Sequence, residues 1–164
     1  MANPVKIGLE CKGYYLSSGT RASWGTATNG ITSGAAPASL TEAKVIKNVT
    51  LTLSSSEADV SSRASIWKLV RKALRDASAE LEIPWNPTDA VFIALETAFM
   101  DPASAGIAMA FLDGDKATTG SQGLWADFDV TEFTREEPLE GAVMAKVKLV
   151  PTSSAVPPEW VKVA

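Results

Sequence analysis

The chain has 164 residues, which is the usual size of a single domain. Apolar residues make up 46% and charged residues 21% of the chain, as in a globular protein. The absence of histidine excludes Ser-His-Asp and Cys-His catalysis and histidine metal ligands, and the single Cys11 excludes an internal disulfide. No apolar run reaches the ~18 residues that span a bilayer, and the N-terminus has no apolar signal region. We therefore expect no membrane partner and synthesis in a cytoplasm.

The net charge is only −4, but its distribution is uneven. Five basic residues and no acidic ones lie between Val60 and Arg75. From Asp76 to Ala145, fourteen acidic residues stand against two basic ones, a balance of −12. This asymmetry predicts two surfaces with different electrostatic roles. A nucleic-acid-binding domain is expected to be basic overall, whereas acidic residues dominate here.

The N-terminal third combines two predicted strands with a long connection. Lys6 to Leu16 is predicted to be the first strand. Residues 17–41 are rich in Ser, Gly, Thr and Ala, so we expect a long flexible loop that becomes ordered on contact with a partner. Lys44 to Ser54 alternates apolar and polar residues, which predicts a second, half-buried strand.

The basic segment that follows has apolar residues at helical spacing. Ser61 or Ser62 can cap a short helix there. The residues at helical spacing are Ile66, Leu69, Val70, Ala73 and Leu74. Such a helix would present its lysines and arginines to nucleic-acid phosphates, to solvent, or to an acidic patch on a neighbouring subunit.

The next segment predicts a third strand and a second helix. Apolar and polar residues alternate from Ala79 to Trp85. Thr88 is then placed to cap a helix, with Asp89 in its first turn, and Pro102 ends it. The apolar stripe of this helix is Val91, Phe92, Leu95, Ala98 and Phe99.

The rest of the chain predicts four more strands around one core. Their expected ranges are Gly106–Leu112, Gln122–Arg135, Leu139–Val150 and Trp160–Val163. Phe133 breaks the alternation of its strand, which predicts a bulge between Val130 and Phe133. We predict a single, mainly β domain over residues 1–164. It is a β-sandwich or barrel flanked by one or two α-helices, with a short C-terminal arm at 151–164.

Two clusters of acidic residues carry no complete chemical site. The Asp113-Gly-Asp115 sequence resembles part of a calcium loop, but the further ligands and the closing glutamate are missing, so a hairpin turn is favoured. Asp127 and Asp129 share one face of a strand, as an acid–base pair would. No nucleophile, oxyanion donor or phosphate loop accompanies them. We expect an acidic surface stripe, and no catalytic, cofactor or metal site.

Three of the five tryptophans have distinct predicted places. Trp85 is in phase with the buried face of its strand and is predicted to lie in the core. Trp125 is out of phase with the apolar residues of its strand, and Trp24 lies in the long loop. The last two are predicted to be exposed for stacking on sugar or buried in a subunit interface.

Three stretches together carry a resemblance to a known family. They are residues 48–63, residues 76–85 with the helix that follows, and residues 126–141 with a valine-rich strand and the closing Pro157-Pro158-Glu159-Trp160-Val161. Their order and spacing are similar to those of the major tail tube proteins of long-tailed, siphovirus-type bacteriophages. The similarity covers the chain from about Lys44 to the end and the strand from Gly8 to Tyr15.

The resemblance implies a structural virion protein of the tail tube fold. It implies hexameric rings stacked into a tube through which double-stranded DNA passes without specific binding. The implied partners are further copies of the chain, the tail tip or initiator, the tape measure protein and the terminator. The resemblance also implies that the protein is located in the virion tail and is synthesised and assembled in the cytoplasm of the host bacterium.

A tube that DNA slides through should have an acidic lumen, because like charges disfavour contacts with phosphates. The candidate lumen-facing acids are Glu80, Glu82, Asp127 and Asp129. Closed rings also need interfaces between copies. The candidate interface residues are Trp24, Arg71, Lys72, Arg75, Trp125 and Trp160.

Three alternatives stay open at this point. The first is the tube protein of a contractile tail or of a type VI-like secretion system, which belong to the same fold family. The second is a β-sandwich carbohydrate-binding module that uses Trp24 and Trp125. The third is an enzyme that uses the Asp127 and Asp129 carboxylates.

Overall fold

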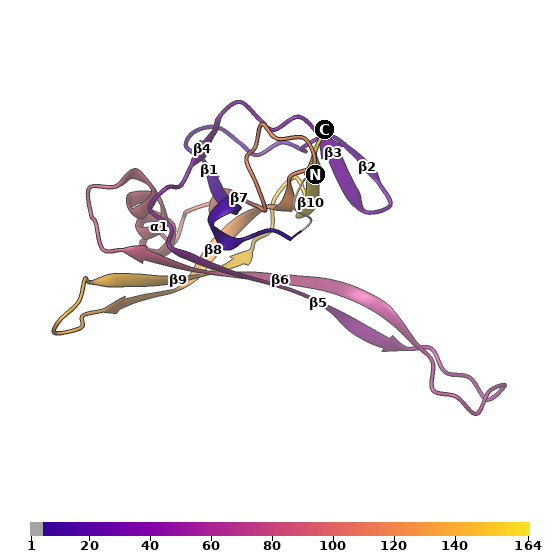
Figure 1. Cartoon of the computed structure of the whole chain (residues 1–164). Coiled ribbons are helices and arrows are strands. Elements are labelled where there is room, and N and C mark those ends of the chain that lie inside the picture. The colour runs from indigo at the N-terminus through magenta and orange to yellow at the C-terminus, as the bar shows by residue number, and fades with distance from the viewer. Residues whose placement is uncertain (1–4) are drawn as a thin grey trace.

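The computed structural model describes residues 5–164, in which a ten-stranded sheet curls into an open half-barrel (Figure 1). A 3₁₀ turn, η1 (Gly8–Glu10), precedes the sheet, and one α-helix, α1 (Ala90–Met100), packs on its flank within the described residues. The strands are β1 (Lys12–Leu16), β2 (Thr26–Thr28), β3 (Ile31–Gly34), β4 (Leu40–Glu42), β5 (Asn48–Asp59), β6 (Val70–Pro84), β7 (Ile107–Leu112), β8 (Gln122–Glu136), β9 (Met144–Pro151) and β10 (Glu159–Val163). The mainly β fold with a flanking helix is therefore confirmed.

The long strand β8 joins two arms of the sheet. Its first half pairs with β10 on one side and with β7 on the other. From Phe128 onward it pairs with β9, which leads to β6 and then to β5. The register shifts between Val130 and Glu132, so the predicted bulge is confirmed. All these pairings are antiparallel, and the pairing of β10 with β3 is parallel.

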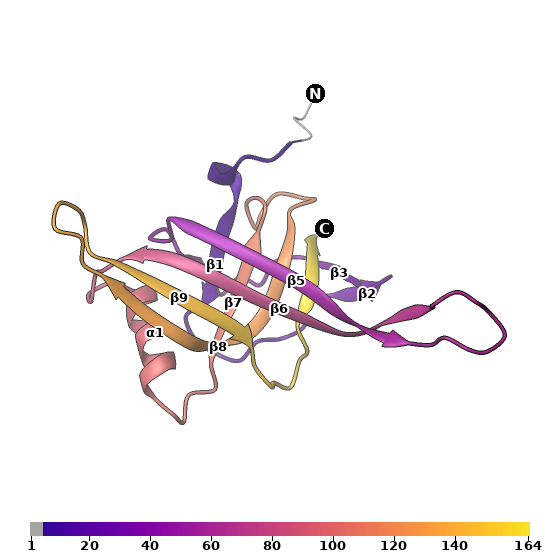
Figure 2. The same ribbon diagram turned by 90° about the horizontal axis from the view of Figure 1, so that it is seen from below.

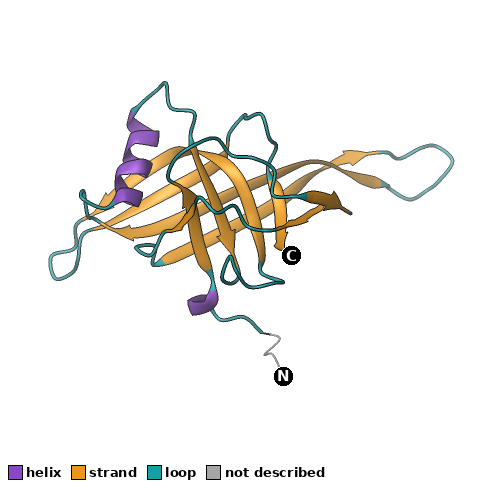
Figure 3. Ribbon diagram, turned by 90° about the horizontal axis from the view of Figure 1, so that it is seen from above, coloured by secondary structure: helices purple, strands orange, loops and turns teal. Residues whose placement is uncertain are grey.

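The larger core lies between α1 and the apolar face of β6, β7, β8 and β9 (Figure 3). The alternation that predicted these strands places Leu81, Phe128 and Val147 on this face, and each is at most 2% exposed. Trp85 packs against this core, with its ring centroid 4.9 Å from that of Phe92. Burial of this apolar surface is the main favourable term in folding.

The segment predicted as a flexible loop is instead folded onto the subunit. Residues 17–41 contain β2 and β3 and the first two residues of β4, and β3 pairs with β10. They cover a second core in which Trp24 is 4% and Trp125 0% exposed. The two rings meet edge to face at 5.8 Å. Both tryptophans are thus buried within one subunit, which corrects the expectation of exposed or inter-subunit rings.

The predicted helix in the basic segment is wrong. Residues 60–69 form the tip of a β-hairpin, and β6 begins at Val70 and pairs with β5 from Asp59 back to Asn48 (Figure 2). The five apolar residues at helical spacing have no surface to pack against, since Ile66 is 98% and Leu74 81% exposed. Pairing with a distant strand satisfies the backbone here, and such tertiary context overrides a short periodic pattern.

Asp89, and not Thr88, caps the helix. The Asp89 carboxylate accepts hydrogen bonds from the backbone N–H groups of Val91 (2.9 Å) and Phe92 (3.2 Å). The Thr88 hydroxyl donates instead to the side chain of Asn86. The charged cap also complements the positive end of the helix dipole.

Replacing Asp89 by alanine should therefore lower the free energy of unfolding by about 1 kcal/mol, the usual cost of a lost N-cap. Thr88→Ala is the matched control and should have a clearly smaller effect. Urea unfolding of both variants, followed by tryptophan fluorescence, measures the difference. Equal losses in the two variants would contradict the assignment.

Candidate self-assembly surfaces

Two long strand edges lack a neighbour in the described part of the chain. β5, twelve residues long, pairs with β6 alone. Beyond Phe128, β8 pairs with β9 on one side and with no strand on the other. Unpaired edges present rows of free N–H and C=O groups that can pair with another chain. These two edges bound the four-stranded part of the sheet in the order β5-β6-β9-β8.

The face of this four-stranded sheet that points away from α1 is polar. Two rows cross it, which are Asn48–Glu82–Lys146–Thr134 and Thr50–Glu80–Lys148–Glu132. Glu80 and Glu82 lie opposite the apolar face, as the alternation predicted, but lysines of β9 stand between them and the acids of β8. The face therefore carries alternating charges and is not uniformly acidic.

Lys146 is held within this array. Its ammonium donates a hydrogen bond to Glu136 (2.7 Å), and this bond, with the negative charges of Glu136, Glu82 and Glu80, raises the pKa of Lys146 above its usual value. Glu82 in turn accepts a hydrogen bond from the Asn48 amide (2.6 Å). Cross-strand pairs of opposite charge stabilise the sheet and lower the effective charge of its surface.

Asp127 is separated from this face by an internal ion pair. Its carboxylate accepts a hydrogen bond from Nε of Arg21 (2.8 Å), whose side chain is 0% exposed. The Arg21 guanidinium also donates to the carbonyls of Val156 and Pro157. Asp127 therefore fixes residues 17–25 and the C-terminal arm to β8, which corrects its placement among free acidic groups.

No sequence pattern indicates the role of Arg21, because its partners are more than 100 residues away in the chain. A periodic pattern reports which face a residue occupies, and a pairing of this range leaves no such pattern. Asp129, two residues after Asp127, is half-buried and keeps its place among the candidate lumen acids.

The three basic interface candidates lie on the hairpin. Arg71, Lys72 and Arg75 are exposed on β6, opposite Ala58, Glu57 and Ser55 of β5. The hairpin extends beyond the body of the subunit (Figure 2), and the Arg75 guanidinium lies near Gly30 in the turn between β2 and β3. Its tip also exposes apolar side chains, namely Val60, Ile66, Trp67 and Leu69. Exposed apolar side chains gathered at such a tip are typical of a protein contact.

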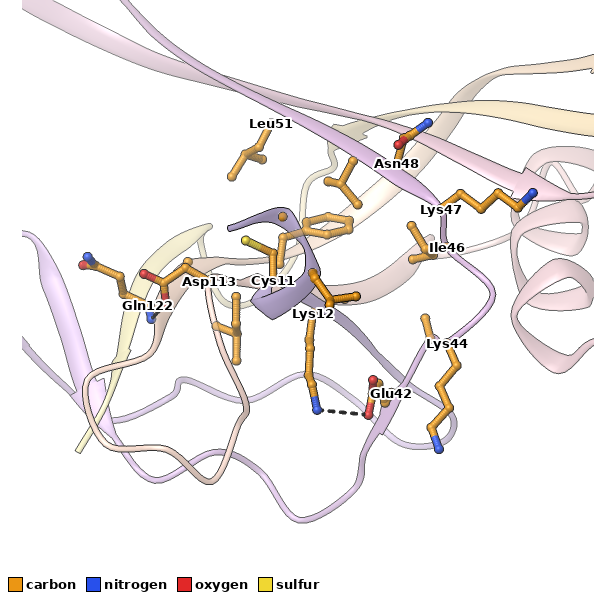
Figure 4. Close-up of a pocket in the computed structure, with 18 of the residues that line it drawn as sticks. Cys11, Lys12, Glu42, Lys44, Ile46, Lys47, Asn48, Leu51, Asp113 and Gln122 are labelled. Atoms are coloured by element: carbon orange, nitrogen blue, oxygen red, sulfur yellow. Dashed lines mark hydrogen bonds and ion pairs between the residues drawn. The ribbon is translucent and has the colours of Figure 1, made fainter. Parts of the chain in front are cut away.

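A groove of about 860 Å³ opens beside the start of β5. It is lined by η1, the beginning of β1, the connection from β4 into β5, the end of β7 and the start of β8 (Figure 4). Trp160, the last of the interface candidates, lies in its wall and is half-buried. Within residues 5–164 no group of histidine, cysteine, aspartate or glutamate side chains is arranged to hold a metal ion, and no helix is long and apolar enough to cross a membrane.

Several solved structures with a similar fold come from tails, tail tubes or baseplates. No protein-family profile and no curated protein matches the chain. A chain in the tail of an empty gene transfer agent particle, refined with C6 symmetry, has a TM-score of 0.62 at 12% identity, covering 92% of this chain and 96% of its own. A chain of the SPP1 tail tube has a TM-score of 0.62 at 14% identity, covering 89% and 75%.

A chain of the anti-feeding prophage baseplate, with sixfold symmetry applied, is also similar, with a TM-score of 0.55 at 8% identity over 91% and 92% of the two chains. The chain has the phage tail tube fold. At these identities the likeness concerns the fold, and the role of this chain must be argued from its own surfaces.

Arg21 is buried and pairs with Asp127, so Arg21→Leu should strongly lower the free energy of unfolding. It leaves Asp127 without its partner, and breaking such a buried pair costs about 3–5 kcal/mol. Denaturant unfolding should show a large drop in the transition midpoint. Glu137→Gln, which removes the exposed pair with Arg135, is the control and should leave the midpoint nearly unchanged. An equally small effect for Arg21→Leu would contradict a stabilising role for the Arg21–Asp127 pair.

Proposed function

We propose that this chain is the structural subunit of a phage tail tube, a stack of hexameric rings through which double-stranded DNA passes into the bacterial host. One observation carries the proposal. A four-stranded sheet with one apolar and one polar face ends on both sides in an unpaired edge, β5 and the second half of β8. A subunit of that kind is incomplete on its own and is completed by identical neighbours.

The edges are suited to a ring. Each strand in the order β5-β6-β9-β8 is antiparallel to its neighbour, so β8 and β5 run in opposite directions. The β8 edge of a second copy can therefore pair with β5 and continue the sheet in antiparallel order. Such a contact joins different surfaces of two copies. A contact of this type closes into a ring when its rotation divides a full turn. Closure of the ring leaves no free edge on the four-stranded sheets β5-β6-β9-β8 of its subunits.

The polar face then lines the bore, because α1 and the core occupy the other face. The acids on it are Glu80, Glu82, Asp129, Glu132 and Glu136, against Lys146 and Lys148. Acids outnumber bases, and the bond to Glu136 reduces the freedom of Lys146 to reach a phosphate. DNA affinity rests mainly on phosphate contacts with free cations, so this lining lets DNA slide.

The hairpin is suited to contact between rings. It extends along the long strands away from the body, with basic sides at Arg71, Lys72 and Arg75 and an apolar tip (Figure 1). A segment that leaves its own subunit in this way reaches a neighbouring ring in a stack. Further partners would be the initiator at the tail tip, the tape measure and the terminator, with assembly in the host cytoplasm.

A second candidate follows from the anti-feeding prophage likeness. The same surfaces would build the inner tube of a contractile tail or of a secretion machine. Tubes without a sheath in lysates of the producing cell favour the long non-contractile tail, whereas a sheath around them favours the second candidate.

Negative-stain electron microscopy of the purified chain at high concentration tests the proposal. Rings and stacked tubes with a central channel are the expected result. A chain that stays monomeric by analytical ultracentrifugation over the whole accessible concentration range contradicts it.

The tip of the hairpin should be needed for stacking more than for ring closure. Ile66→Ser with Trp67→Ser removes two exposed apolar groups from the tip, so rings should still form while tubes become short or absent. Met100→Ser on α1 is the control, because it removes an apolar side chain that is also largely exposed, at 65%, but lies away from the proposed contact. Micrographs showing tubes of normal length for the double variant would contradict this role.

Removing acidic groups from the bore should slow DNA passage. Glu80→Gln with Glu82→Gln leaves the lysines of β9 less compensated, so phosphates should be retained more strongly. Ejection from assembled particles should be slower at low salt and recover at high salt. Glu96→Gln on α1 is the control with no expected effect. Salt-independent, unchanged ejection in the double variant would count against a bore lined by this face.

A further inference from the structure

The proposed ring leaves one large feature of the subunit without an occupant, the groove beside β5. We propose that it receives the acidic turn of a second copy, residues 137–143 between β8 and β9, with Leu139 as the apolar anchor. This inference rests on the proposed function, since it names the contact that accompanies the joining of strand edges around the ring.

The groove combines an apolar lining with a rim that is basic at Lys44 and Lys47, while Glu42 pairs with Lys12 and Asp113 lies on the other side. Its apolar wall includes Ile46, Leu51, Phe111 and Trp160. Lys44 and Lys47 stand where the chain enters β5, at the side of the groove away from Asp113 and Gln122 (Figure 4). Both lysines are exposed and form no ion pair among the described residues. The groove is therefore suited to an apolar group flanked by negative charge.

The acidic turn has the complementary chemistry. Leu139 is 101% exposed at its tip, between Glu137 and Glu140. Glu137 is paired only with the exposed Arg135 beside it, and Glu140 forms no ion pair in the described structure. Complementary charge at such a rim guides association and fixes register, and an apolar anchor in a pocket supplies most of the binding energy.

Continuation of the sheet from one copy to the next at the same level would bring the two features together. Within one subunit, a row of paired residues links Asn48 of β5 through Glu82 and Lys146 to Thr134 of β8. If the neighbour's β8 continues the sheet at this level, its Thr134 lies beside Asn48, to within the stagger that closing a barrel requires. From there the neighbour's chain runs on through its acidic turn, while the first chain runs back from Asn48 through Lys47 to Lys44.

The apolar hairpin tip is the other occupant to consider, and its charge argues against it. Trp67 is flanked by Arg63 and Lys68, so placing it in the groove would bring these cations next to Lys44 and Lys47. Figure 1 also shows the hairpin tip and the acidic turn at opposite ends of the long strands, so one copy can offer both to different neighbours.

Charge exchange tests the contact. The groove variant Lys44→Glu with Lys47→Glu, and the turn variant Glu137→Lys with Glu140→Lys, should each raise the protein concentration needed for assembly by about tenfold or more, because like charges then meet. One chain carrying all four changes should assemble nearly as the wild type does. Sedimentation velocity measures the concentration dependence. Loss of assembly that the four-fold variant does not reverse overturns the proposal.

A crosslink locates the occupant directly. Cys11 is exposed and lines the groove, so Leu139→Cys places a second thiol in the neighbour's turn. A bismaleimide, which tolerates a wider gap than a disulfide does, should give a ladder of covalent oligomers from assembled rings on a denaturing gel. Trp67→Cys is the matched variant for the hairpin tip. A ladder from Trp67→Cys and not from Leu139→Cys assigns the groove to the hairpin and overturns the proposal.

These outcomes distinguish a failure of ring assembly from a failure of the docking contact. A wild-type chain that never assembles refutes the proposed function itself. Wild-type rings that withstand both charge variants and give no Leu139→Cys ladder refute only the docking of the acidic turn.

Discussion

The fold rests on one constraint, which is that the four-stranded sheet β5-β6-β9-β8 cannot close on itself within a single chain. Its apolar face is covered by α1 and by the rest of the body, but both its edges are open. Monomeric proteins usually blunt such edges with charges, prolines or short strands. Here β5 runs for twelve residues with a side-chain pattern of threonine, leucine and serine. In the proposed ring, pairing with identical copies would leave no free edge and would turn a liability of the monomer into an assembly surface.

The hydrogen bonds of Arg21 to Asp127, Val156 and Pro157, here called the Arg21 clamp, hold a cover over the first half of β8. The same side of β8 is therefore buried in its first half and open in its second. Trp125 and Asp127 lie under residues 17–25 and the C-terminal arm, which Arg21 ties together. Beyond them the cover ends, the bulge after Val130 shifts the register, and Glu132 emerges on the exposed polar face. Burial of the arginine is tolerated because a carboxylate and backbone carbonyls satisfy its donors. The Arg21–Asp127 pair thus marks the boundary between the covered part of β8 and the part with an unpaired edge.

Local patterns predicted what depends on neighbours along the chain. Alternation located β7, β8, β9 and the second part of β6, and the broken alternation at Phe133 located the bulge. Non-local pairing defeated the same reasoning elsewhere. The stretch after Ser61 has a helical spacing of apolar residues, but from Val70 onward its backbone pairs with β5. The Ser/Gly-rich segment is ordered because Trp24 packs against Trp125, about 100 residues later in the chain. The mixed charge of the polar face was missed for the same reason, because only the pairing of strands shows that Lys146 and Lys148 stand between rows of acids.

That interleaving changes the physical picture of a bore for DNA. A uniformly acidic sheet would repel phosphates, but it would also repel itself, because like charges directly opposite each other destabilise neighbouring strands. Lysines in the middle strand remove this penalty. The Lys146 ammonium is also held by its hydrogen bond to Glu136, which, with the nearby negative charges, raises the pKa of Lys146. A cation already held by carboxylates offers little to a passing phosphate. In the proposed tube, such a lining would be stable as a sheet and weakly adhesive to DNA at once, a combination that neither a purely acidic nor a purely neutral face provides as directly.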